Sequence, residues 1–194
     1  GQRLSLQIDG EAVCEIDLNA SQPSLFSALV GIKMNVGNTW TDAYQAVVDK
    51  LTLDEDPKVL RSKVKQVIVE MTGSGNSQRK GPAKNSEDNL FNETEGSLLQ
   101  YDTIRLAALE VMPALHKLNR SYLNATGFLS FHEANILTET LLRLKDMGIV
   151  AYGVHDCVIV KCSCKDEAIN PYRAIIRSYV LKVQKNSGVP KVVT

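Results

Sequence analysis

The feature that most constrains the fold is a His-Asp step set between two apolar runs. Residues 149–152 read Ile-Val-Ala-Tyr and residues 158–160 read Val-Ile-Val, with His155 and Asp156 between them. Such runs on either side of a polar step are typical of two short buried strands joined by a tight turn. An aspartate held at the tip is costly unless something pairs with it, and a metal ion is the first candidate.

A second aspartate ends a strand-like run near the N-terminus, where residues 13–18 read Val-Cys-Glu-Ile-Asp-Leu. If the two strands are neighbours, Asp17 and Asp156 supply two carboxylates at one edge of a sheet. Two carboxylates are the minimum needed to hold Mg²⁺ for phosphoryl transfer. The pair therefore predicts a metal site.

The rest of the chain predicts an α+β fold in a single domain over residues 1–194. Alternating apolar residues before Asp9-Gly10, and the run after it, predict a hairpin. Asp56-Pro57 predicts a helix start, because it joins an N-cap residue to a proline in the first turn. Helices are predicted over residues 23–30, 41–51, 57–72, 101–118, 129–147 and 166–185. Residues 72–98, rich in Gly, Ser, Asn, Lys and Glu, predict a long exposed loop. This order favours a small antiparallel sheet with helices on one face.

Overall charge favours no nucleic-acid partner, because the 22 Lys and Arg residues balance the 22 Asp and Glu residues. A basic groove would have to be local. No apolar run reaches membrane-spanning length and no signal peptide is visible.

The four cysteines do not form a recognisable metal site. Cys14 is distant in sequence from Cys157, Cys162 and Cys164, and the spacing holds neither a Cys-x-x-Cys pair nor a completing histidine set. Structural zinc is therefore disfavoured. We expect reduced, partly buried thiols and a cytoplasmic location.

Three short motifs together resemble the palm and fingers core of the family A DNA polymerases and the single-subunit phage-type RNA polymerases. The strand–His155-Asp156–strand unit resembles their motif C. Asp17, followed by a turn and a helix that reaches Gly31, resembles motif A, with Gln22 where the DNA polymerases have a sugar-gating glutamate. The resemblance implies a palm sheet with a helical, fingers-like insertion over residues 33–100.

Motif B is resembled by the helix of residues 57–72, where Arg61 and Lys65 have the family's four-residue spacing. The family's later Tyr-Gly step is replaced by Gly73-Ser74. The helix ahead of motif C carries His132 and Glu133 where these polymerases place polar residues toward the primer end and the minor groove. His155 resembles the neighbour that shapes the primer site.

The resemblance implies a two-metal reaction on a primer–template with nucleoside triphosphates. Asp17 and Asp156 would bind Mg²⁺ or Mn²⁺, with the backbone carbonyl of Leu18 as a further ligand. Arg61 and Lys65 would neutralise the triphosphate. Each motif also has an ordinary explanation: turn or helix-capping aspartates, and cations on a solvated helix face.

Three functions follow for testing. The first is a template-directed nucleotidyltransferase similar to a phage or mobile-element DNA polymerase. The second is a catalytically inactive palm-like module that binds nucleic acid or a replication partner, which the missing tyrosine, Gln22 and the neutral charge favour. The third is metal-dependent phosphodiester hydrolysis by the same aspartates. The choice between DNA and RNA stays open.

Overall fold

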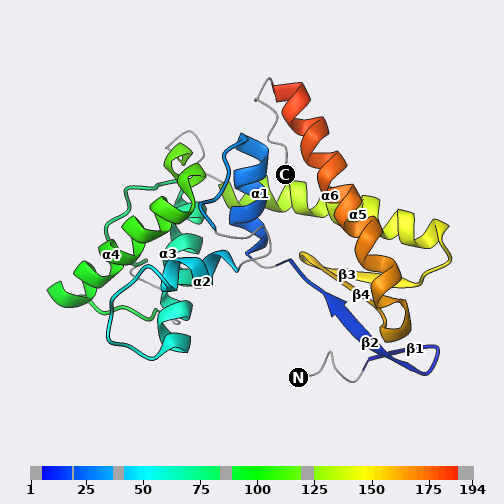
Figure 1. The fold of residues 1–194 in the computed structure, drawn as a ribbon, viewed down its shortest axis with the longest axis horizontal. Helices are drawn as coiled ribbons and strands as arrows, with labels where there is room; N and C mark the ends of the chain where they lie inside the picture. Colours follow the sequence, from blue (N-terminus) through cyan, green and yellow to red (C-terminus); the bar gives the residue numbers. More distant parts are fainter. Residues whose placement is uncertain (1–5, 19, 37–41, 84–88, 119–124, 188–194) are drawn as a thin grey trace.

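The chain forms a four-stranded antiparallel sheet with helices packed beside it, in a computed structural model that describes residues 6–18, 20–36, 42–83, 89–118 and 125–187 (Figure 1). The strand order is β1-β2-β4-β3. The strands are β1 (Gln7–Ile8), β2 (Glu11–Ile16), β3 (Ala151–Val154) and β4 (Cys157–Lys161). Both predicted hairpins and the α+β class are confirmed.

The register of the two central strands determines where the aspartates lie. Ile16 of β2 is opposite Val158 of β4, so Asp17 follows β2 at the edge where the β3–β4 hairpin turns. Val154 pairs with Cys157, which leaves His155 and Asp156 as the two-residue turn. His155 takes a left-handed backbone conformation with φ 56°. Such turns match the twist of the flanking strands.

Two long helices, α5 (Ala125–Asp146) and α6 (Lys165–Ser187), cover one face of this sheet. On that face β3 approaches α5 so closely that a Cβ atom at Gly153 would lie 2.7 Å from Leu137 Cδ2. From the α6 side, the Tyr172 hydroxyl donates a 2.7 Å hydrogen bond to the carbonyl oxygen of Asp156. The hairpin tip is therefore positioned from both helices.

The other helices in the described residues are α1 (Ser21–Val30), α2 (Ala43–Val48), α3 (Pro57–Ser74), α4 (Glu95–Val111), and the 3₁₀ helices η2 (Pro113–Lys117) and η4 (Cys162–Cys164). The predicted helices are confirmed with shifted ends. Asp56 caps α3 by accepting hydrogen bonds from the backbone N–H groups of Lys58 and Val59. α4 starts earlier than predicted because Thr94 caps it, and it ends at Val111 because Pro113 lacks an N–H for a continuing helix.

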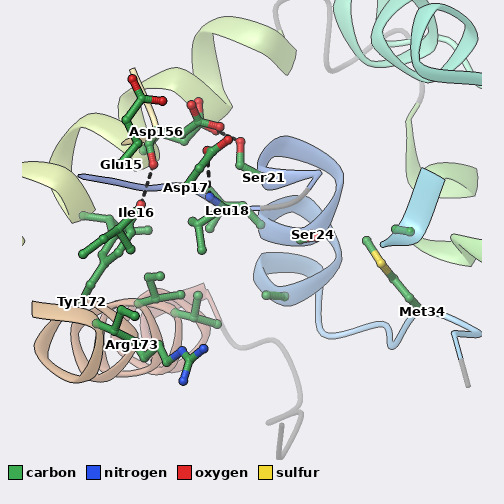
Figure 2. A pocket seen from close by; sticks show the side chains of 18 of the residues that line it. Glu15, Ile16, Asp17, Leu18, Ser21, Ser24, Met34, Asp156, Tyr172 and Arg173 are labelled. Atoms are coloured by element: carbon green, nitrogen blue, oxygen red, sulfur yellow. Dashed lines mark hydrogen bonds between the residues drawn. The ribbon is translucent and has the colours of Figure 1, made fainter. Parts of the chain in front are cut away.

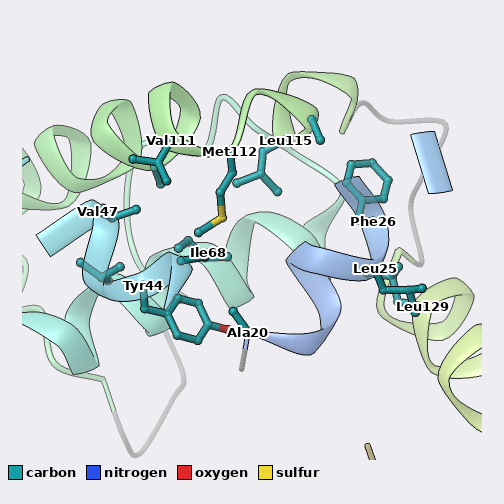
Figure 3. Packing of buried hydrophobic residues seen from close by; sticks show 14 of the residues in the cluster. Ala20, Leu25, Phe26, Tyr44, Val47, Ile68, Val111, Met112, Leu115 and Leu129 are labelled. Atoms are coloured by element: carbon teal, nitrogen blue, oxygen red, sulfur yellow. The ribbon is translucent and has the colours of Figure 1, made fainter. Parts of the chain in front are cut away.

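One cluster of buried side chains connects the residues 33–100 segment to the rest of the chain (Figure 3). Phe26 of α1, Ile68 of α3 and Met112 are each fully buried within it. The same cluster continues to Leu129 of α5. The segment therefore shares its core with the helices around the sheet.

The prediction of a long exposed loop over residues 72–98 is confirmed only in part: residues 75–83 and 89–94 form no helix or strand, but both ends of the range are helical and some side chains within it are buried. Helix α3 continues to Ser74, and Phe91 is buried with its ring edge-on to Tyr101 at 5.1 Å between centroids. Glu70 accepts hydrogen bonds from the Tyr101 hydroxyl and from Arg79 Nε. Polar composition suggested solvent exposure, but these side chains bind one another. Residues 84–88 of the predicted loop lie outside the described residues.

The prediction of reduced thiols is wrong for Cys14 and Cys162, which form a disulfide across 148 residues of sequence. Cys14 lies in β2 opposite Val160, and Cys162 follows the end of β4. The bond therefore joins β2 covalently to the residue that follows β4. Cys157 and Cys164 remain thiols.

Candidate functional site

The predicted site residues converge on one cavity of about 700 Å³, formed by the end of β2, the hairpin tip, and helices α1, α2, α3 and α5. All of them except His132 line it. They are Asp17, Leu18, Gln22, Arg61, Lys65, Glu133, His155 and Asp156. These residues come from segments far apart in the sequence, so tertiary packing alone brings them together.

The negative charge of Asp156 acts on the carboxyl group of Asp17. The pKa of Asp17 is raised above its usual value, first by burial and then by the negative charge of Asp156. The Leu18 backbone N–H donates a 2.8 Å hydrogen bond to Asp17 Oδ1, which acts in the opposite direction without cancelling the increase. Two like charges at one sheet edge favour a cation between or beside them.

A second cavity of about 490 Å³ extends from the same aspartates between α1 and α6 (Figure 2). Figure 2 shows Asp17, Ser21 and Asp156 at one end of it and α6, with Tyr172 and Arg173, along its side. Burial, followed by the charges of Asp156 and Asp17, raises the pKa of the Tyr172 hydroxyl. Tyr172 therefore stays protonated and continues to hold the Asp156 backbone. No sequence pattern had pointed to it.

Glu133 of α5 organises the start of α1. Its Oε1 accepts a 2.7 Å hydrogen bond from Ser21 Oγ, and its Oε2 accepts a 3.3 Å bond from Gln22 Nε2. Because a carboxylate only accepts, the amide NH₂ of Gln22 faces Glu133. Glu133 thus controls the orientation of Gln22, the residue at the predicted sugar-facing position.

Arg61 and Lys65 lie one turn apart on α3 and both line the cavity. Arg61 forms an ion pair with Asp42, and its guanidinium carbon lies 5.5 Å from the ring centre of Tyr44. Lys65 is exposed, and its positive charge partly opposes the increase in the pKa of Asp17. The cavity therefore has an acidic side at the sheet edge and a basic side on α3.

His132 does not reach the cavity. Its ring is buried, and its Nδ1 lies 2.8 Å from the Tyr179 hydroxyl oxygen of α6, to which Asn135 Nδ2 also donates. Burial lowers the pKa of His132. Neighbouring helix positions point about 100° apart, so Glu133 can face the cavity while His132 faces α6. The structure therefore places His132 against α6, away from the cavity that the other predicted site residues line.

Val69 and Tyr44 are among the cavity residues that were not predicted as site residues. Val69, which is 49% exposed, continues the Arg61–Lys65 row by another turn, so the spacing itself could have identified it. Tyr44 is buried, and burial followed by the charge of Asp42 raises its pKa to about 12. Tyr44 lies within the helix predicted over residues 41–51.

The donor set at the aspartates suits a hard cation. Among the described residues, no group of three or more His, Cys, Asp and Glu side chains is placed to hold a metal ion. Mg²⁺, however, is commonly held by one or two carboxylates together with substrate phosphates and water. Two carboxylates and the Leu18 carbonyl are oxygen donors of that kind, and burial followed by the negative charge of Asp156 raises the pKa of Asp17.

Comparisons with protein-family models, curated proteins and solved structures found no match for this chain. Within the described ranges, no helix is both long and apolar enough to cross a membrane.

Proposed function

We propose that this chain is a template-directed nucleotidyltransferase, similar to a DNA polymerase. The sheet with α5 and α6 would be its palm, and residues 33–100 its fingers-like insertion. One observation supports the proposal above all: a single cavity has Asp17 and Asp156 on one side and Arg61 and Lys65 on the other. A nucleoside triphosphate needs cations for its phosphates and a metal-binding edge at its reacting phosphorus.

Asp17, Asp156 and the Leu18 carbonyl are the groups that would hold Mg²⁺ or Mn²⁺. When bound, the metal would activate the primer 3′-hydroxyl and stabilise charge on the leaving pyrophosphate. Tyr172 contributes by fastening the Asp156 backbone, which keeps that carboxylate at the sheet edge.

The other residues of the cavity have separate tasks in this proposal. Arg61 and Lys65 neutralise the triphosphate, because fixed cations are worth more in a partly enclosed cavity than in water. Gln22, oriented by Glu133, faces the sugar. His155, exposed on the hairpin turn, lies beside the primer end.

Primer extension tests the proposal. The protein is incubated with a primed DNA or RNA template, nucleoside or deoxynucleoside triphosphates, and Mg²⁺. We expect incorporation that falls by about a hundredfold or more in Asp17→Asn and in Asp156→Asn, as when a central electrostatic group is removed. Asp146→Asn, an exposed carboxylate at the end of α5, is the matched control and keeps full activity. Incorporation that Asp156→Asn leaves unchanged refutes the proposed site.

A catalytically inactive palm-like module is the second candidate, and the Asp42–Arg61 ion pair favours it because that arginine is already engaged. Salt-sensitive binding of DNA or RNA without incorporation by the intact protein would identify this function. Release of nucleotides from an unextended strand would instead identify hydrolysis by the same aspartates.

The proposed partners are a primer–template and nucleoside triphosphates. The predicted cytoplasmic location stays a prediction, and the Cys14–Cys162 disulfide argues against it because disulfides persist mainly in oxidising compartments.

A further inference from the structure

Arg61 is held by a carboxylate of the same chain. Asp42 Oδ2 accepts hydrogen bonds from two guanidinium nitrogens of Arg61, Nε at 3.2 Å and Nη2. The Tyr44 ring lies beneath the guanidinium. Because one planar fork of donors suits a carboxylate and a phosphate equally, Asp42 occupies a pair of Arg61 donors that a triphosphate could otherwise use.

The second oxygen of Asp42 has a different partner. Its Oδ1 accepts hydrogen bonds from the backbone N–H groups of Tyr44 at 2.9 Å and Gln45 at 3.4 Å, and so caps α2. Burial would raise the pKa of Asp42, but Arg61 and these N–H groups outweigh it and lower the pKa. The carboxylate is therefore ionised at neutral pH and links α2 to α3.

We propose that Asp42 is an internal competitor of the triphosphate: it binds Arg61 in the empty site, and a nucleotide must displace it. This inference rests on the proposed role of Arg61 as a triphosphate ligand. The exchange transfers the arginine from the Asp42 carboxylate to the ligand and breaks this one polar link between α2 and α3. Asp42 is thus a positioning residue that sets nucleotide affinity and touches no reacting atom.

The exposure of the pair makes such an exchange possible. The Arg61 side chain is 40% exposed and that of Asp42 is 24% exposed, so water and ligands reach both. A partly exposed ion pair weakens the affinity of a competing ligand about fivefold. A triphosphate carries several negative charges and also meets Lys65, which lies one turn further along α3.

Asp42→Asn isolates the competition. Asparagine is as good an N-cap as aspartate, so α2 keeps its cap while the charge that holds Arg61 is removed. Inorganic triphosphate is the probe, and its dissociation constant is measured by titration calorimetry on the full chain, without divalent metal. We expect the variant to bind triphosphate about fivefold more tightly than the wild type. Circular dichroism checks that the helix content is unchanged.

Two controls distinguish the release of Arg61 from a general change of charge. Asp56→Asn makes the same change at the cap of α3 and alters the net charge by the same amount. Because Asp56 accepts hydrogen bonds from the backbone of α3, the Asp56→Asn variant should bind triphosphate with the wild-type affinity. In an Arg61→Gln background, Asp42→Asn should have no effect, because the group that it releases is gone.

An unchanged affinity in Asp42→Asn overturns the inference, as does an equal increase in Asp56→Asn or in the Arg61→Gln background. If triphosphate binds neither the wild type nor Asp42→Asn, Arg61 is no triphosphate ligand and the inference fails together with the proposed nucleotide site. If Asp42→Asn and its controls bind triphosphate as expected but the protein shows no primer extension, the inference is supported and the polymerase proposal fails.

Discussion

Gly153 lies in β3 two residues before the hairpin tip, where the strand meets α5. A Cβ at this position would lie 2.7 Å from Leu137 Cδ2, 3.0 Å from its Cγ and 3.2 Å from its Cδ1. Real Cβ atoms do not approach so closely, so Gly153→Ala must move Leu137 or separate β3 from α5. Leu137 also lines the cavity at the aspartates, which links this packing contact to the site.

The expected cost follows from two opposing terms. Overpacking a well-packed contact typically costs about 1–3 kcal/mol. Replacing glycine in a strand returns about 0.5–1 kcal/mol, because alanine loses less backbone freedom on folding. We therefore expect Gly153→Ala to lower the free energy of unfolding by about 1 kcal/mol, and by no more than about 2.5 kcal/mol. The measurement is urea unfolding followed by far-ultraviolet circular dichroism.

Gly96 provides the matched control, because a Cβ there would meet nothing within 4 Å. It lies in the first turn of α4, so Gly96→Ala should raise the free energy of unfolding by about 0.5–1 kcal/mol. The two substitutions make the same chemical change and are predicted to have opposite signs. A Gly153→Ala variant as stable as the wild type would refute the reasoning. The reasoning would also be refuted if Gly153→Ala cost the same free energy of unfolding in a Leu137→Ala background, because the clash is absent there.

Three other perturbations have directions set by the structure. His155→Gly should raise the free energy of unfolding by up to about 1 kcal/mol in urea titrations, because glycine adopts the left-handed backbone without strain, whereas His155→Val should lower it. Burial lowers the pKa of His132 in the folded chain. At pH values below the ordinary histidine pKa of about 6.5, the unfolded chain therefore binds this proton more readily than the folded chain. Stability should therefore fall between pH 7.5 and 5.5 and fall less in His132→Gln; equal slopes would contradict this. Reduction of Cys14–Cys162 should cost about 2–4 kcal/mol because the bond closes a long loop, and Cys14→Ser should be insensitive to reductant.

Local patterns were sufficient for most of the secondary structure. The Asp56-Pro57 start of α3 and the strand–turn–strand unit around Asp156 depend on hydrogen bonds and backbone preferences within a few residues. The predicted neighbours Asp17 and Asp156 also lie at one sheet edge, because apolar strand patterns place their ends predictably once the strands pair. Polar composition led to a wrong prediction of solvent exposure where polar side chains hydrogen-bond with one another, as around Glu70.

The sequence by itself determined most of the elements, the α+β class and eight of the residues that line the cavity. Only the tertiary structure decided which partner each of them takes. Asp42 with Arg61, and Glu133 with Gln22, join helices that are separated in the sequence, and no local pattern encodes such a pairing. The same holds for the Cys14–Cys162 bond, whose partners are 148 residues apart. Hydrogen bonds and ion pairs act over a few ångströms, so the packing of the helices against the sheet determines which charges meet and which remain for a ligand.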